Sequence, residues 1–175
     1  MLASCKVLHR FCNRAPAVSP AQVLVRDTVY VLYEPPEGTP RTMDVIFIHG
    51  LQLGDYRQAW LTTWQSKQDD GQKFCWPEIF LGQDFPGARV LSVSYDSAAR
   101  KAHDKGRHDL VAIGEALASV LQEEDVGEVP VFFVGHSLGG LVLKQVGYRL
   151  QQLFFPDAAR LSLMRRLAGL STINQ

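Results

Sequence analysis

The sequence has no excess of charge, no long apolar run and few cysteines. Its 175 residues carry 18 Lys and Arg against 18 Asp and Glu, which gives no electrostatic case for binding nucleic acid. No apolar stretch approaches the roughly 20 residues of a membrane-spanning helix, so we expect no span of a bilayer. Cys5, Cys12 and Cys75 are odd in number and scattered. They indicate a reducing compartment, without a disulfide framework or metal-ligand spacing.

The segment that says most about function is Gly135-His136-Ser137-Leu138-Gly139, a Gly-x-Ser-x-Gly motif. The apolar run 131–134 precedes it and a helix-like stretch follows at once. This order is typical of a nucleophile elbow, a tight turn that lifts a serine hydroxyl off the end of a parallel sheet. Because such a serine has a strained backbone, its neighbours two places away must be small. We therefore predict that Ser137 is a catalytic nucleophile.

A second motif ends another buried-strand pattern, 43–48, in His49-Gly50. In an α/β-hydrolase such a loop lies beside the elbow and supplies one backbone N–H group to the oxyanion hole. We predict that Leu51, helped by Gln52, is this donor and that the N–H of Leu138 is the other. His49 itself is expected to be a strand-end residue hydrogen-bonded to the loop backbone, with a role as a base as the alternative.

Strand and helix patterns alternate along the chain. Strands are predicted at 28–33, 44–48, 88–95 and 131–136, and helices from 109, with Leu110, Ile113, Leu117 and Val120 on one stripe, and over 138–153. This alternation predicts an α/β fold with a doubly wound, mostly parallel sheet.

Aromatic residues are concentrated between the two motifs. Tyr56, Trp60 and Trp64 recur every four residues and could form one face of a short helix. We expect this face to pack in the core, with the lining of an acyl pocket or a lid as the alternative. Trp76-Pro77 is typical of a helix start with proline at the first position.

The two ends of the chain differ from the middle. Residues 1–26 contain Lys6 and several arginines and no acidic residue before Asp27, which is typical of a transit peptide or of a basic tail without an address. Residues 156–175 are predicted to form a divergent basic tail, amphipathic over 160–167 and unlike a continuing sheet. The domain between them is 27–155.

The motifs together resemble the serine-active-site-containing protein family over about residues 27–150. The matching segments are Phe47-Ile48-His49-Gly50-Leu51, Ala59-Trp60, Trp76-Pro77, Phe85-Pro86-Gly87-Ala88-Arg89-Val90, Ser94-Tyr95-Asp96-Ser97 and 134–145. These are α/β-hydrolases of the lipase/esterase type, linked in animals to phosphatidylglycerol remodelling and cholesterol trafficking at mitochondria–endoplasmic reticulum contacts.

The resemblance implies the N-terminal half of an α/β-hydrolase fold and an acyl-ester substrate, such as a phospholipid. It implies neither a metal nor an organic cofactor, and an intracellular address in mitochondria, endoplasmic reticulum or a plastid. Peripheral membrane association and the oligomeric state stay open.

The sequence lacks a histidine after Ser137, although the triad of this fold runs Ser, Asp or Glu, then His. The histidines are His9, His49, His103, His108 and His136, and the only later acid is Asp157. The family continues to a Thr-Pro-His-type loop, from which 161–175 departs, as an alternative transcript end or truncated gene model would explain. We expect His103 and His108 to lie in a solvated loop and Asp96 to cap a turn, with catalytic roles as the alternatives.

Two hypotheses of different classes follow. The first is a serine ester hydrolase whose general base and acid are missing from this chain. The second is a catalytically inactive, hydrolase-like binding or scaffold fragment. A thioesterase or peptidase cannot be separated from an esterase, because elbow and oxyanion hole serve any acyl transfer. A half-finished sheet would also expose an unpaired edge and an apolar face, so we expect the isolated chain to be poorly soluble or bound to a partner.

Overall fold

The computed structural model describes residues 23–26, 28–52, 55–97, 110–154 and 171–173. A six-stranded sheet organises them, with the strand order β1-β2-β6-β3-β7-β8. The strands are β1 (Val23–Arg26), β2 (Val29–Tyr33), β3 (Met43–Ile48), β6 (Ala88–Val93), β7 (Val131–His136) and β8 (Ser171–Ile173). Strands β6, β3, β7 and β8 are parallel, and β1 and β2 form an antiparallel edge. The predicted α/β fold with a mostly parallel sheet is confirmed.

The central strand β3 aligns the sheet so that three strands end together. Ile48 pairs with Val93 of β6 on one side and with Gly135 of β7 on the other. Residues 45–48 are buried, as expected of a parallel strand covered on both faces. The segments that follow β3, β6 and β7 therefore leave the sheet at the same edge, where the two sequence motifs meet.

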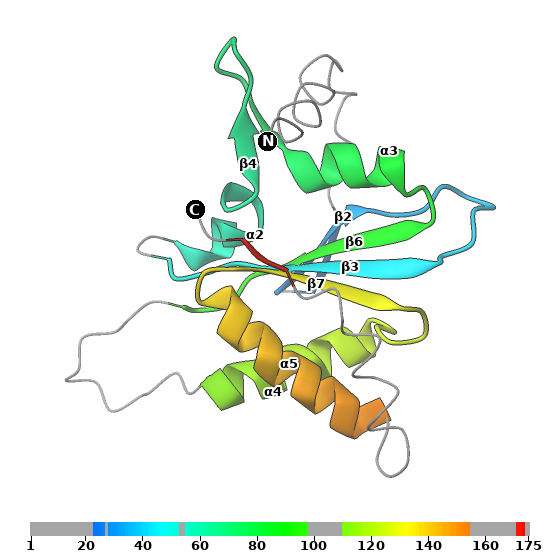
Figure 1. The fold of residues 1–175 in the computed structure, drawn as a ribbon, viewed down its shortest axis with the longest axis vertical. Helices are drawn as coiled ribbons and strands as arrows, with labels where there is room; N and C mark the ends of the chain where they lie inside the picture. Colours follow the sequence, from blue (N-terminus) through cyan, green and yellow to red (C-terminus); the bar gives the residue numbers. More distant parts are fainter. Residues whose placement is uncertain (1–22, 27, 53–54, 98–109, 155–170, 174–175) are drawn as a thin grey trace, which may run out of the picture.

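Two helices, α4 (Leu110–Glu123) and α5 (Gly139–Phe154), cover one face of the sheet. Figure 1 shows both of them below the sheet. Leu117 is buried in the core between these helices and the strands, and Leu110, Ile113 and Val120 pack against the same core. The stripe predicted for this helix is confirmed. Among the described residues, no helix is long and apolar enough to cross a membrane.

The opposite face carries shorter segments: η1 (Tyr56–Gln58), α2 (Ala59–Thr62), the hairpin β4 (Gln65–Lys67) and β5 (Lys73–Cys75), η2 (Pro77–Leu81) and α3 (Gly82–Asp84). Trp60 and Trp64 are buried against the sheet, and the Trp60 ring stacks on Tyr30 with centroids 4.2 Å apart. Core packing of these tryptophans is confirmed. The predicted single helical face is wrong, because the chain forms a 3₁₀ turn and one short α-helix between Tyr56 and Trp64. Pro77 does begin a helical segment.

A short strand occurs within each of the two segments that were predicted as tails, and the predicted domain bounds themselves stay predictions. Strand β1 lies within the predicted basic tail 1–26 and pairs with β2. Strand β8 lies within the predicted divergent tail 156–175 and extends the sheet parallel to β7. Both strands satisfy backbone groups that the neighbouring strand would otherwise leave unpaired. Residues 1–22 and 155–170, which hold most of both predicted tails, lie outside the described residues.

A buried ion pair joins β3 and β6 near the start of these strands, at the end of the sheet away from the two motifs. Asp44 of β3 accepts two hydrogen bonds from the Arg89 guanidinium of β6, at 2.9 and 3.0 Å. Asp44 and Arg89 are also cross-strand partners in the parallel ladder. The bidentate contact therefore holds the register in which β3 and β6 end together.

Candidate active site

The elbow after β7 has the strained geometry that the motif predicts. Ser137 is exposed and has a φ of 52°, in the left-handed region that side chains rarely adopt. A Cβ on Gly135 would lie 2.9 Å from the backbone nitrogen of Gly140. A Cβ on Gly139 would meet the carbonyl oxygens of Ile48 and His49. The predicted requirement for small residues on both sides of Ser137 is confirmed.

The His49-Gly50 loop lies directly against this elbow. A Cβ on Gly50 would stand 2.8 Å from the carbonyl oxygen of His136 and 2.9 Å from Cβ of Ser137. Real Cβ contacts are essentially never shorter than 3.0 Å, so only glycine fits between the two loops. The structure thus brings together the two motifs that lie almost 90 residues apart in the sequence, as their spacing and order predicted.

His49 is a structural residue and is not placed to act as a base. It is fully buried, its Nε2 accepts the backbone N–H of Tyr95 at 3.1 Å, and its Nδ1 lies 2.7 Å from the Gly50 carbonyl oxygen. Since Nε2 accepts, Nδ1 carries the proton and donates to Gly50. Burial lowers the pKa of His49 to about 4, against the opposing effect of the bond to Gly50. The strand-end role predicted for His49 is confirmed.

Tyr95 completes this arrangement from the end of β6. Its hydroxyl donates to the His49 carbonyl oxygen at 2.7 Å, and its ring stacks on the imidazole with centroids 4.3 Å apart. Tyr95 lies in one of the segments that carry the family resemblance, but its contact with His49 was not predicted. Its position two residues after β6, at the end of the sheet where the two motifs meet, is the signal that could have found it.

The bond from His49 sets the direction of the predicted oxyanion donor. The Gly50 carbonyl and the Leu51 N–H belong to one peptide group, and no cis peptide bond occurs among the described residues. In a trans peptide these two groups point in opposite directions. Because His49 holds the carbonyl inward, the Leu51 N–H points away from the buried imidazole. Neither Leu51 nor Leu138 donates its N–H to another residue of the described part of the chain. Their role as oxyanion donors stays a prediction.

Gln52 does not have the role that the sequence suggested. Its backbone N–H donates to Oγ of Ser97 at 3.0 Å, and its side-chain amide donates to Oγ1 of Thr63 at 3.2 Å. The N–H that was expected to help hold an oxyanion is therefore already occupied. The expectation is wrong because a buried hydroxyl from a distant segment captures this donor.

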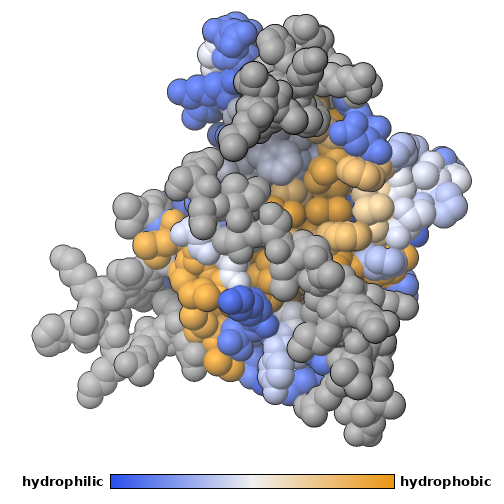
Figure 2. Space-filling model, viewed as in Figure 1, coloured by the Kyte–Doolittle hydropathy of each residue, from blue (hydrophilic) through white to orange (hydrophobic). Residues whose placement is uncertain are grey.

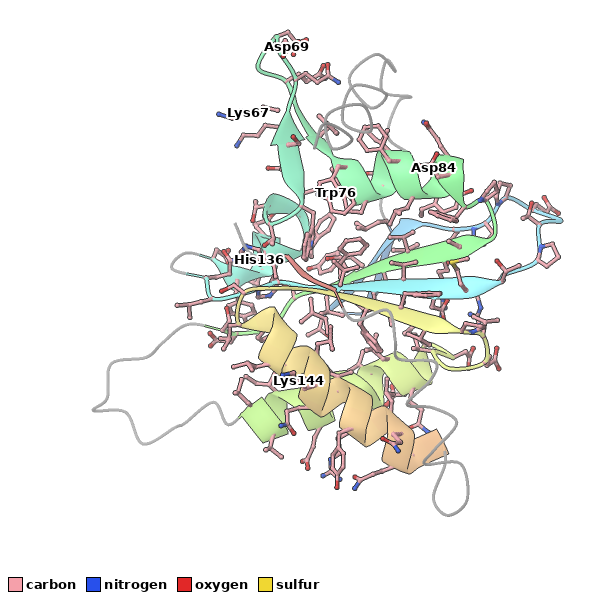
Figure 3. The ribbon with its side chains drawn as sticks, in the orientation of Figure 1. Lys67, Asp69, Trp76, Asp84, His136 and Lys144 are labelled. Carbon is pink, nitrogen blue, oxygen red and sulfur yellow. The ribbon has the colours of Figure 1, made fainter. Side chains whose placement is uncertain are left out.

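The structure describes two histidines near the elbow, His49 and His136. His49 uses both ring nitrogens, and the ring of His136 packs edge-on against Trp64, 6.3 Å between centroids. Figure 3 shows His136 at the end of β7 close to α2, with Lys144 away from it on α5. Nδ1 of His136 is buried and has no hydrogen-bond partner in the described structure.

Other sequence candidates are untested. His9, His103, His108 and Asp157 lie outside the described residues. The roles weighed for Asp96, which lies directly after Tyr95, stay predictions. Within the described ranges, no three His, Cys, Asp or Glu side chains converge as metal ligands would.

The sequence of this chain was compared with those of known proteins. No family model matches the chain. The chain is 34% identical over 139 residues to Protein SERAC1 of Danio rerio, a match that covers 69% of this chain. The chain is related to the SERAC1 proteins. SERAC1 of Bos taurus is 33% identical over 132 residues, and that of Homo sapiens is 30% identical over 137. In each case the chain spans only 20% of the length of SERAC1. The resemblance drawn from the motifs is confirmed.

The solved structures that resemble this chain have lower sequence identity to it than the SERAC1 proteins have. The type II thioesterase BorB of the borrelidin biosynthetic cluster superposes with a TM-score of 0.45 at 15% identity, over 75% of this chain and 46% of BorB. A predicted CIB-like hydrolase of Thermoplasma acidophilum superposes with a TM-score of 0.42 at 17% identity, over 91% of this chain and 63% of that hydrolase.

Proposed function

We propose that this chain carries the nucleophile and the oxyanion hole of a serine hydrolase of the lipase/esterase type. The observation that supports it most is the backbone of Ser137, an exposed serine with a φ of 52° between two glycines that admit no Cβ. Strain of this kind costs about 1–3 kcal/mol and is found mainly at functional sites. A serine with a merely structural role would not require it.

In the proposed reaction, Oγ of Ser137 attacks the acyl carbon of an ester. The former carbonyl oxygen becomes an anion, and the N–H groups of Leu51 and Leu138 hold it. The alcohol leaves, and water then releases the acyl group from the serine. A base must take the hydroxyl proton in the first step, and we propose that this base and its orienting acid are missing from this chain.

The apolar surface beside the elbow favours a substrate with an acyl chain. Leu51 is 45% exposed on the oxyanion loop, and Leu141 is 49% exposed in the first turn of α5. Figure 2 shows apolar atoms gathered over this end of α5. A fatty-acyl ester such as a phospholipid would bury these side chains, and peripheral contact with a membrane would bring it there. The basic N-terminal residues are typical of a targeting segment. We therefore extend the proposal to a location in an intracellular organelle.

The alternative is a hydrolase-like binding or scaffold module without catalytic activity. The occupied nitrogens of His49 favour it, since this buried imidazole cannot also accept the Ser137 proton. Without a base, an intact oxyanion hole alone would leave only about 10³–10⁴-fold catalysis over water.

Labelling with a fluorophosphonate probe separates the two. We expect a longer form of the chain that supplies the missing base to label at Ser137, the 175-residue chain to label far more slowly, and Ser137→Ala to abolish labelling. Ser119→Ala is the matched control, because that hydroxyl lies on the exposed side of α4. If a folded longer form labels no faster than its Ser137→Ala variant, Ser137 is not activated and the scaffold hypothesis replaces the hydrolase.

A further inference from the structure

The buried hydroxyl of Ser97 joins the segment after β6 to the loop that carries Leu51. Ser97 is 6% exposed, and its Oγ accepts the backbone N–H of Gln52 at 3.0 Å. The two residues are 45 positions apart, so this bond belongs to no helix or sheet ladder. It ties one irregular segment at the active-site edge to another.

Together with His49, Ser97 fixes the two peptide groups on either side of Leu51. His49 holds the carbonyl of the first peptide group, and Ser97 holds the N–H of the second. A peptide group is planar, so a bond to one of its polar atoms also sets the direction of the other. The N–H of Leu51 is thus aimed by His49 and kept from turning by Ser97.

Gln52 is tied a second time, through its side chain. The amide Nε2 donates to Oγ1 of Thr63, which directly follows α2. The α2 segment is in turn anchored to the sheet, because Oγ of Ser92 donates to the Trp60 carbonyl oxygen at 2.8 Å. Gln52 is therefore held between the end of β6 and the end of α2.

We infer that Ser97, and Thr63 through the Gln52 side chain, are positioning residues that keep the Leu51 N–H aimed at the oxyanion formed at Ser137. This inference rests on the proposed function. Neither hydroxyl touches substrate, and both act through Gln52. Loss of an oxyanion donor costs about 10²–10³-fold in rate. A donor that is loosened but still present should cost less, about tenfold.

The test measures binding of butylboronic acid to the ¹⁵N-labelled full chain. Oγ of Ser137 forms a bond to boron, the hydroxyl proton passes to the buffer, and boron becomes a tetrahedral anion that occupies the oxyanion hole. Such adducts imitate the transition state, and because the measurement is at equilibrium it needs no general base. The amide signals of Leu51 and Leu138 report the two donors separately.

We expect Ser97→Ala to weaken boronate binding about tenfold and to raise the picosecond–nanosecond mobility of the Leu51 N–H, measured by ¹⁵N relaxation. The Leu138 N–H should stay rigid. Thr63→Val should weaken binding about threefold, and Thr63→Ser should restore it. The control Ser119→Ala, which removes a hydroxyl bonded to the Glu115 carbonyl on α4, should change neither quantity. Thermal melting of each variant separates a local effect from a global loss of stability.

The outcomes distinguish the inference from the proposed function. If Leu51 is as rigid in Ser97→Ala as in the wild type, or if both proteins bind boronate and do so with the same affinity, the positioning role is overturned. If Leu51 loosens but the wild-type chain binds no boronate at Ser137, the positioning role stands and acyl transfer at Ser137 fails. If Ser97→Ala does not fold, the pair Thr63→Val and Thr63→Ser decides by the same measurements.

Discussion

The imidazole of His49 is buried, neutral and bonded through both nitrogens. At the scale of single residues, His49 therefore has two effects. It orients the peptide group of Leu51, and it makes the free energy of unfolding depend on pH. Burial lowers the pKa of His49 to about 4, whereas a histidine in the unfolded chain titrates near 6.5. Between these values the unfolded chain binds a proton that the folded chain does not, so acid favours unfolding.

We therefore predict that the free energy of unfolding falls by about 3 kcal/mol from this residue alone as the pH drops from 7 to 4. Urea unfolding at several pH values would measure it. His49→Gln, whose amide does not titrate, should be less stable at pH 7 and should lose this part of the pH dependence. Equal pH dependence in the wild type and His49→Gln would contradict a depressed pKa at this site.

At the scale of elements, the approach of α5 to β3 depends on a residue without a side chain. A Cβ on Gly139 would collide with the backbone carbonyl oxygens of Ile48 and His49, which cannot rotate away as a side chain can. Overpacking of this kind costs about 1–3 kcal/mol. We predict that Gly139→Ala lowers the free energy of unfolding by about 3 kcal/mol, since the added methyl group must push α5 off the sheet.

Chemical denaturation of Gly139→Ala beside Gln122→Ala would check this. Gln122 lies on the exposed side of α4, so its change to alanine should alter stability little. A Gly139→Ala chain as stable as the wild type would mean that α5 tolerates displacement at this point.

The sequence predicted the elements that have a strong local pattern and missed the contacts that join them. The strand before Ser137 and the helix after it follow from an apolar run and a glycine motif, and the contact of Gly50 with the elbow follows from strand order. The bonds from Ser97 and Tyr95 join residues about 45 positions apart. No periodicity marks such a pair, because a single hydroxyl or ring decides it.

The short edge strands were missed for a different reason. Strands β1 and β8 gain order from pairing with β2 and β7, and their own sequences carry too few residues for a periodic signal. The prediction for Gln52 failed because it treated the oxyanion loop alone, without the segment that packs against it.

At the scale of the whole molecule, the two faces of the sheet are covered unequally. Helix α5 packs on one face along β3 and β7, and α4 packs against α5 on the same side of the sheet. On the other face α2, η2 and α3 contact β6, and η2 also contacts β2. Phe132 of β7 alternates with Phe133, which is buried under α4 and α5, and so lies on this second face. It is 39% exposed.

We predict that the isolated chain associates through this second face of β7. An exposed aromatic side chain beside a short edge strand favours pairing or docking of another chain. Light scattering after size-exclusion chromatography should show oligomers or aggregates of the wild type and a larger monomer fraction for Phe132→Thr. Phe85→Thr is the matched control, because Phe85 is 47% exposed but follows α3, away from β7. A monodisperse wild-type monomer that melts cooperatively would show that the face over β7 needs no partner.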